Sequence, residues 1–197
     1  MMHRTIRAIF AMSVMPIYFA ANAAEPAPAP AAAARPPLTL TTTAFADGTQ
    51  IPVKYTQAGE QISPVLSWTN VPEGTQSFVL HMRDPDVARN KTTEDQVHWL
   101  VWGIPGTTKG MPEGVPKGEK LGDGSQQISA SGPVYRGPGA PATGPLHHYT
   151  FELFALDTKI DVAAGADAWE TRTKVYQAMN GHILGKAVYV GLFRRPQ

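Results

Sequence analysis

Cysteine is absent from the 197 residues of this chain. Without it, the protein has no disulfide bond, no thiol nucleophile and no thiolate ligand for a metal ion. A lipid-anchored cysteine is excluded for the same reason. The absence removes thiol enzymes and cysteine-based zinc proteins from the classes that this sequence can belong to.

A large excess of either charge is also absent. The 17 lysine and arginine residues nearly balance the 16 aspartate and glutamate residues, which gives a formal net charge of +1. Proteins that bind nucleic acids carry a basic surface, and no cluster of basic residues interleaved with aromatic residues occurs here. DNA and RNA are therefore excluded as expected partners.

The apolar run near the N-terminus is too short for a membrane-spanning helix, which needs roughly 20 residues. It covers only residues 8–20 and contains Pro16. Two arginines precede it, and an A-x-A motif follows it at residues 21–23, so the segment has the three parts of a secretory signal. We predict that residues 1–23 are a cleaved signal peptide, that no transmembrane anchor remains, and that the protein is periplasmic or secreted.

A proline- and alanine-rich tract, AEPAPAPAAAARPP, follows at residues 24–37. Such a tract cannot bury a core and is typical of an extended linker. Residues 38–197 have the length of one domain with one core.

From residue 38 onward, short segments with period-two alternation are separated by glycine, proline, asparagine and aspartate. This pattern predicts strands, most clearly at residues 38–45, 65–71, 77–84, 97–105, 148–156 and 186–193. One helical pattern comes late, at residues 167–182, and residues 106–127 have no pattern and are expected to form a loop. The predicted fold class is mainly β: an antiparallel sandwich or barrel with a late C-terminal helix.

Two aspartates end the alternating run FVLHMRDPD at residues 78–86. Three apolar residues of this run share a face with Asp84, so its carboxylate points toward the core and needs a hydrogen-bond donor. Pro85 interrupts the strand, which leaves Asp86 in a turn. Either Asp84 orients a functional group, or Asp-Pro-Asp is only a turn sequence.

A histidine occupies an inward position in the next predicted strand. His98 shares its expected face with Leu100, Trp102 and Ile104. This position fits either a core histidine or a residue of a functional site.

The segment YRGPGAPATGPLHHYTFEL begins with a turn and ends in a strand, where His147 and Tyr149 point inward together and His148 points outward. The turn offers the N–H groups of Gly137 and Gly139 to an anion. The Gly-Lys-Ser/Thr of a phosphate loop and the G-x-S-x-G of a nucleophile elbow are both absent. A metal site built from Asp84, His98 and His147 stays a minor alternative.

Four motifs occur in a characteristic order: SPVLSWTNVPEGTQSFVLHMRDPDVA, HWLVWGIP, YRGPGAPATGPLHHYTFELFALD and AMNGHILGKAVYVGLF. Over residues 38–197 they resemble the phosphatidylethanolamine-binding protein family, in its bacterial Raf-kinase-inhibitor-like branch. Two departures stand out. Val87-Ala88 replaces the usual Ala-Pro, which predicts a changed pocket rim, and Gly103 replaces a frequent asparagine.

The resemblance implies an antiparallel β-sandwich with a late helix, small peripheral helices and a shallow pocket at one end that accepts phosphate-type anions. It implies neither a cofactor nor a metal ion. The site residues that it implies are Asp84, Asp86, His98, Gly137, Pro138, His147 and Tyr149.

Three functions follow as hypotheses. The first is a non-catalytic, exported binding protein for a small anionic or phosphorylated ligand: a phospholipid head group, a phosphomonoester or a phosphorylated peptide. The second is inhibition of a partner protein, a kinase or a protease, through surface loops such as residues 106–127. The third is a hydrolase in which His98 or His147 acts as a base beside Asp84 or a metal-bound water, although no nucleophile is recognisable. Binding to a protein partner and formation of a homodimer are both possible on this sequence.

Overall fold

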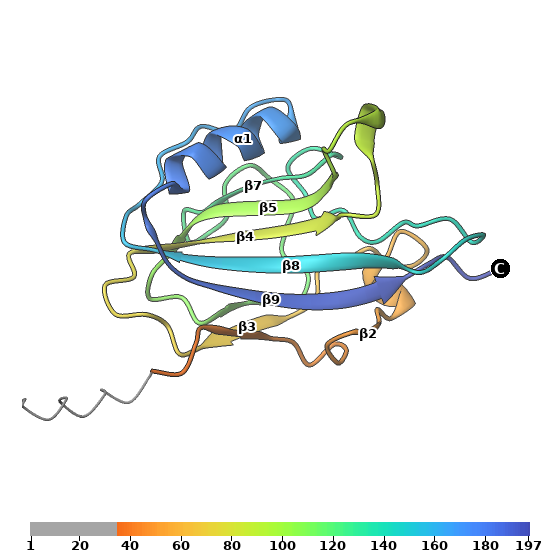
Figure 1. The fold of residues 1–197 in the computed structure, drawn as a ribbon, viewed down its shortest axis with the longest axis horizontal. Coiled ribbons are helices and arrows are strands. Elements are labelled where there is room, and N and C mark those ends of the chain that lie inside the picture. The colour runs from red at the N-terminus through yellow and green to blue at the C-terminus, as the bar shows by residue number, and fades with distance from the viewer. Residues whose placement is uncertain (1–34) are drawn as a thin grey trace, which may run out of the picture. The chain divides into compact units, whose positions relative to one another are not determined.

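The computed structural model describes residues 35–197 (Figure 1). The predicted signal peptide, residues 1–23, and most of the predicted linker, residues 24–37, lie outside the described residues. Within the described range, no helix has the length and apolar character needed to span a bilayer.

The described residues form two β-sheets, one α-helix and two short 3₁₀ helices. The large sheet has the strand order β2 (Thr49–Gln50), β9 (Ile183–Phe193), β8 (His147–Leu156), β4 (Ser77–Asp84), β5 (Gln96–Pro105), β7 (Gln126–Ile128). The small sheet has the order β1 (Thr39–Thr41), β3 (Leu66–Thr69), β6 (Gly110–Met111). The helices are η1 (Val53–Tyr55), η2 (Arg89–Lys91) and α1 (Ala168–Met179). The prediction of a mainly β fold with a late C-terminal helix is confirmed.

Two expectations about the strands need correction. The arrangement is not antiparallel throughout, because β2 pairs with β9 in parallel. A hairpin would make two neighbouring strands antiparallel, but β2 and β9 are far apart along the chain and no hairpin joins them. The segment 106–127, expected as a loop, contains β6 and the start of β7; strands of two and three residues are too short to show alternation.

The large sheet is covered on both faces, and alternation along its strands explains how. On β4, Phe78, Leu80 and Met82 join the apolar cluster shared by the two sheets, whereas Val79 joins a second cluster against α1. Figure 1 shows α1 beside the upper strands of the large sheet. The helix begins at Asp167, whose carboxylate accepts hydrogen bonds from two backbone N–H groups of the first turn, and Asn180 caps its end.

Strand β5 departs from simple alternation, which corrects the predicted positions of its side chains. The sequence predicts that four residues of this strand lie on one face: His98, Leu100, Trp102 and Ile104. Leu100 and Trp102 pack toward α1, whereas Ile104 belongs to the cluster between the sheets. The ring of His98 packs edge-on against Tyr149 of that same cluster, with the ring centroids 5.0 Å apart.

Two breaks in the pairing of β4 with β5 cause this division. Met82 pairs with Trp99 and Arg83 with Val97, so His98 is an extra residue in the ladder. Such a bulge changes the face to which the following side chains point. A second irregularity near Gly103, whose φ of +69° favours glycine or asparagine, turns the end of the strand again.

A histidine is completely buried on the face of the large sheet covered by α1. His81 has 0% of its surface exposed, and its Nδ1 lies 2.7 Å from the hydroxyl of Tyr176. Burial, followed by the positive charges of Arg172 and Arg83, holds the pKa of His81 well below its ordinary value of 6.5. The ring is therefore neutral at neutral pH.

The free energy of unfolding is expected to fall as the pH drops below 6.5, because the unfolded chain then takes up a proton at residue 81 that the folded protein excludes. One such histidine changes the free energy by about 1.4 kcal/mol per pH unit. His81→Phe should therefore remove about 2 kcal/mol of the loss between roughly pH 6.5 and pH 5, measured by urea unfolding. His182→Gln, at an exposed histidine, is the control, because the predicted effect depends on the buried ring and not on the loss of any histidine. Equal slopes for His81→Phe and the wild type would contradict the prediction.

Candidate functional site

A polar cavity of 170 Å³ lies at the end of the large sheet where β4 ends and β8 begins, toward the right of Figure 1. Four of the seven predicted site residues line it: Asp84, His98, His147 and Tyr149. The other lining residues are Gln57, Val87, Gln96, Arg136, Gly139, Ala140 and Pro141. Val87 is the lining residue at the position where the family that this sequence resembles usually has alanine.

Asp84 and His147 form a hydrogen-bonded pair across the adjacent strands β4 and β8. Asp84 is 2% exposed, and its Oδ2 lies 2.8 Å from Nδ1 of His147. Its Oδ1 accepts a hydrogen bond of 3.1 Å from the backbone N–H of Asp86. Because an ionised carboxylate only accepts hydrogen bonds, Nδ1 of His147 carries a proton and Nε2 is the free nitrogen of the ring.

The ring of His98 is also fixed by a hydrogen bond at Nδ1. Its Nδ1 lies 2.9 Å from the carbonyl oxygen of Arg136, so Nδ1 donates to that carbonyl. Burial lowers the pKa of His98, although its hydrogen bond to the Arg136 carbonyl works against the shift. The neutral ring therefore presents the lone pair of Nε2 as an acceptor.

Tyr149 binds the turn beside the cavity. Its hydroxyl oxygen accepts hydrogen bonds from the N–H groups of Gly139, at 3.1 Å, and Ala140, at 3.0 Å. Burial, followed by the negative charge of Asp84, raises the pKa of Tyr149, so the hydroxyl keeps its proton. The expectation that the Gly139 N–H is offered to an anion is therefore wrong, because this N–H binds the tyrosine.

Gly137 and Pro138 do not line the cavity but hold the turn against the segment after η1. The carbonyl of Gly137 accepts a 2.7 Å hydrogen bond from Nε2 of Gln57, and the carbonyl of Pro138 accepts one of 2.9 Å from the Gln57 backbone. A Cβ atom on Gly137 would lie 2.6 Å from the carbonyl oxygen of Tyr55. Glycine is needed here for a close backbone approach.

Asp86 lies outside the cavity lining and holds the outward histidine. Its Oδ2 accepts hydrogen bonds from the backbone N–H of His148, at 2.6 Å, and from the ring Nδ1, at 3.0 Å. Burial alone would raise the pKa of Asp86, but these two hydrogen bonds lower it. Asp86 is thus ionised at neutral pH and ties the start of β8 to the turn after β4.

A different trio from the predicted one could bring ligand atoms to a metal ion. The ligand atoms of Asp84, Asp86 and His147 lie within 4.8 Å of one another, and His98 is outside this group. Both oxygens of Asp84 and Oδ2 of Asp86 already accept hydrogen bonds from His147, His148 or the backbone. A cation would compete with these donors for the carboxylate oxygens.

Arg136 is the important lining residue that the sequence analysis missed. Among the described lining residues it is the one lysine or arginine, and its buried Nε has no hydrogen-bond partner among the described residues. Its backbone pairs with His98 in both directions, which fixes its position. Its place directly before Gly137-Pro138 was the available signal.

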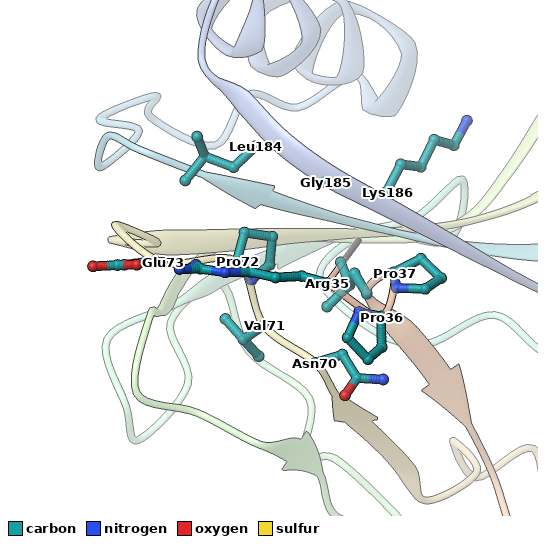
Figure 2. A pocket seen from close by; sticks show the side chains of 11 residues that line it. Arg35, Pro36, Pro37, Asn70, Val71, Pro72, Glu73, Leu184, Gly185 and Lys186 are labelled. Carbon is teal, nitrogen blue, oxygen red and sulfur yellow. Dashed lines mark hydrogen bonds and ion pairs between the residues drawn. The ribbon is translucent and has the colours of Figure 1, made fainter. Parts of the chain in front are cut away.

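A larger cavity, of 580 Å³, lies where the described chain begins (Figure 2). Figure 2 shows the rings of Pro36, Pro37 and Pro72 around it, with Arg35 paired to Glu73 at 2.9 Å. This ion pair is highly exposed, and the lining contains none of the predicted site residues. The smaller polar cavity is therefore the candidate functional site.

The described chain is a mainly β domain with a polar cavity at the ends of its central strands. The sequence model of the phosphatidylethanolamine-binding protein family matches residues 41–194. That match covers most of the chain, so the protein belongs to this family, and the predicted resemblance is confirmed.

Two relatives match most of the chain. A UPF0098 protein of Methanothermobacter thermautotrophicus is 43% identical over 160 residues, which cover 80% of this chain and 99% of the relative. A UPF0098 protein of Aquifex aeolicus is 39% identical over 153 residues, which cover 77% and 85% of the two chains.

Two solved structures share the fold. The CT736 protein of Chlamydia trachomatis, a homologue of phosphatidylethanolamine-binding proteins, is 29% identical, with a TM-score of 0.68 over 81% of this chain and 98% of that chain. E. coli YbcL, a member of the same family, is 25% identical, with a TM-score of 0.68 over 80% and 98% of the two chains.

Proposed function

We propose that this protein is an exported, non-catalytic binding protein whose polar cavity holds a phosphate-type anion. The observation that carries the proposal is the arrangement of donors and acceptors around Asp84 and His147. A histidine ring that donates from both nitrogens can bridge Asp84 and an anionic ligand, with Nδ1 on Asp84 and Nε2 on the ligand. Arg136 adds a permanent positive charge and an Nε–H that lacks a partner among the described residues.

His98 selects the protonation state of the ligand. Its neutral ring accepts at Nε2, so it pairs with a P–OH group better than with a bare phosphate oxygen. A singly protonated phosphate or phosphomonoester offers both oxygens that accept from His147 and Arg136 and a hydroxyl that donates to His98. The site is therefore suited to a monoanion.

The size of the cavity limits what enters it. A volume of 170 Å³ holds a phosphate with a small substituent, since pockets for drug-sized molecules occupy roughly 300–1,000 Å³. A phospholipid would place only its head group inside. Among the described residues, the lining contains no serine, threonine or cysteine, which argues against a covalent reaction at an aliphatic hydroxyl or a thiol.

Phosphate and O-phosphoethanolamine are expected to raise the melting temperature of the purified protein. Both His147→Gln and Arg136→Gln should weaken binding by about tenfold or more, because each removes a charge-assisted hydrogen bond. Calorimetric titration at constant ionic strength measures the dissociation constants.

The chain offers matched controls for both variants. His182→Gln alters another histidine paired with an aspartate, at 2.8 Å, on the exposed surface, and Arg194→Gln alters an exposed arginine. Both should bind like the wild type. Equal loss in the control variants, or no binding by the wild type, would refute the proposed function.

A further inference from the structure

A second polar cavity lies on the other face of the large sheet, between that sheet and α1. It has a volume of 330 Å³, and His81, Arg83, Glu152, Arg172, Tyr176 and Lys186 are among the residues that line it. His81 and Arg83 alternate along β4 with the residues that face the cluster between the sheets. The two cavities therefore share no lining residue and open on different sides of the sheet.

Cationic side chains outnumber carboxylates in the lining of this second cavity. Three cationic side chains line it, Arg83, Arg172 and Lys186, against two carboxylates, Asp95 and Glu152. Lys186 is the least committed of the cations, because its side chain is 45% exposed and its contact with Glu152 is long, at 3.4 Å. Glu94, just outside the lining, also pairs with Arg172, so three carboxylates balance the three cations. A ligand that replaces the long Glu152 contact of Lys186 therefore gains one cationic partner.

Two buried hydrogen-bond donors in the lining lack an acceptor. Nε2 of His81 and Nε of Arg83 have no partner among the described residues. Nδ1 of His81 lies 2.7 Å from the hydroxyl of Tyr176. We assign the hydroxyl as the donor in this contact because it has no other acceptor among the described residues, and this assignment leaves the proton of the neutral ring on Nε2. Unpaired buried donors are costly and favour a ligand that brings acceptor oxygens.

We propose that this second cavity binds a small organic monocarboxylate. The carboxylate oxygens accept from His81, Arg83 and Lys186, after Lys186 turns from Glu152 toward the ligand. A monoanion pairs with the one cation that has a loose contact, Lys186, whereas a phosphate dianion would meet more repulsion from Asp95 and Glu152. The rings of Phe154 and Tyr176, with centroids 6.0 Å apart, form an apolar wall for the rest of the ligand.

Benzoate is a suitable probe, with benzamide as its uncharged counterpart. Benzoate should raise the melting temperature and shift the Nε2–H signal of His81 in long-range ¹H–¹⁵N spectra, and benzamide should do neither. Lys186→Met should weaken benzoate binding by about tenfold, the usual effect of losing one charge-assisted contact. Lys174→Met, at an exposed lysine of α1 paired with Glu170, should bind benzoate like the wild type.

His147→Gln separates this site from the first cavity, because it should leave benzoate binding unchanged. The inference is overturned if benzoate leaves the melting temperature and the His81 signal unchanged, if Lys186→Met binds like the wild type, or if His147→Gln abolishes the effect. His81→Phe provides a second test, because it removes the Nε2–H donor and should also weaken benzoate binding. Residue 81 is buried, so if this variant does not fold, Lys186→Met at a half-exposed residue decides the outcome.

Discussion

Replacing Asp84 by alanine is expected to destabilise the protein by about 3 kcal/mol, because removing one member of a buried pair leaves the other member and nearby donors without a partner. Asp84 is 2% exposed and accepts from both Nδ1 of His147 and the N–H of Asp86. Urea unfolding measures the change in the free energy of unfolding.

The same substitution is expected to weaken phosphate binding by about tenfold or more, although it removes a negative charge from an anion site. The 2.8 Å contact between Asp84 and Nδ1 fixes the direction of the His147 ring. We expect the loss of this contact to outweigh the repulsion that is removed between two negative charges. What is lost is an N–H donor held in one direction toward the ligand.

A surface pair provides the matched control. Asp157→Ala removes a carboxylate that pairs with His182 at 2.8 Å while about half exposed. Such a pair contributes roughly 0–1 kcal/mol, so this variant should be nearly as stable as the wild type and should bind phosphate normally. Phosphate binding by Asp84→Ala at wild-type affinity would show that the pair does not orient the ligand.

Alternation was enough to place the residues of β4 and β8 in the site. The predicted strand 77–84 coincides with β4, and the inward positions of Asp84, His147 and Tyr149 follow from the period of two. A strand that is apolar on one face for several residues has only one register that buries that face. These three side chains therefore meet in the structure as the sequence predicted.

The position of His98 could not be derived in the same way. A bulge depends on how two strands pair, and no residue of β5 marks His98 as the extra one. The contact between Gln57 and Gly137 joins residues 80 positions apart, which no local pattern reveals. Arg136 was missed because an arginine next to a turn is usually a surface residue, and only the fold shows that its backbone pairs with His98.

Gly137→Ala is expected to have the second large effect, through the backbone and not through the ligand. A Cβ atom at residue 137 would lie 2.6 Å from the carbonyl oxygen of Tyr55 and 2.9 Å from the Cα of Thr56. Backbone atoms cannot rotate away, so the turn or the segment after η1 must shift, at a cost of about 1–3 kcal/mol or more. The shift would also break the two hydrogen bonds from Gln57 that hold the turn beside the cavity.

The expected result for Gly137→Ala is a lower free energy of unfolding together with weaker phosphate binding, although no contact with the ligand is removed. Gly122→Ala is the control, because a Cβ atom there meets nothing within 4 Å and the backbone has no positive φ. Urea unfolding and calorimetric titration measure both quantities for the two variants. If Gly137→Ala matches Gly122→Ala in stability, close backbone approach does not explain the glycine. If Gly137→Ala is unstable but binds normally, the turn does not shape the cavity.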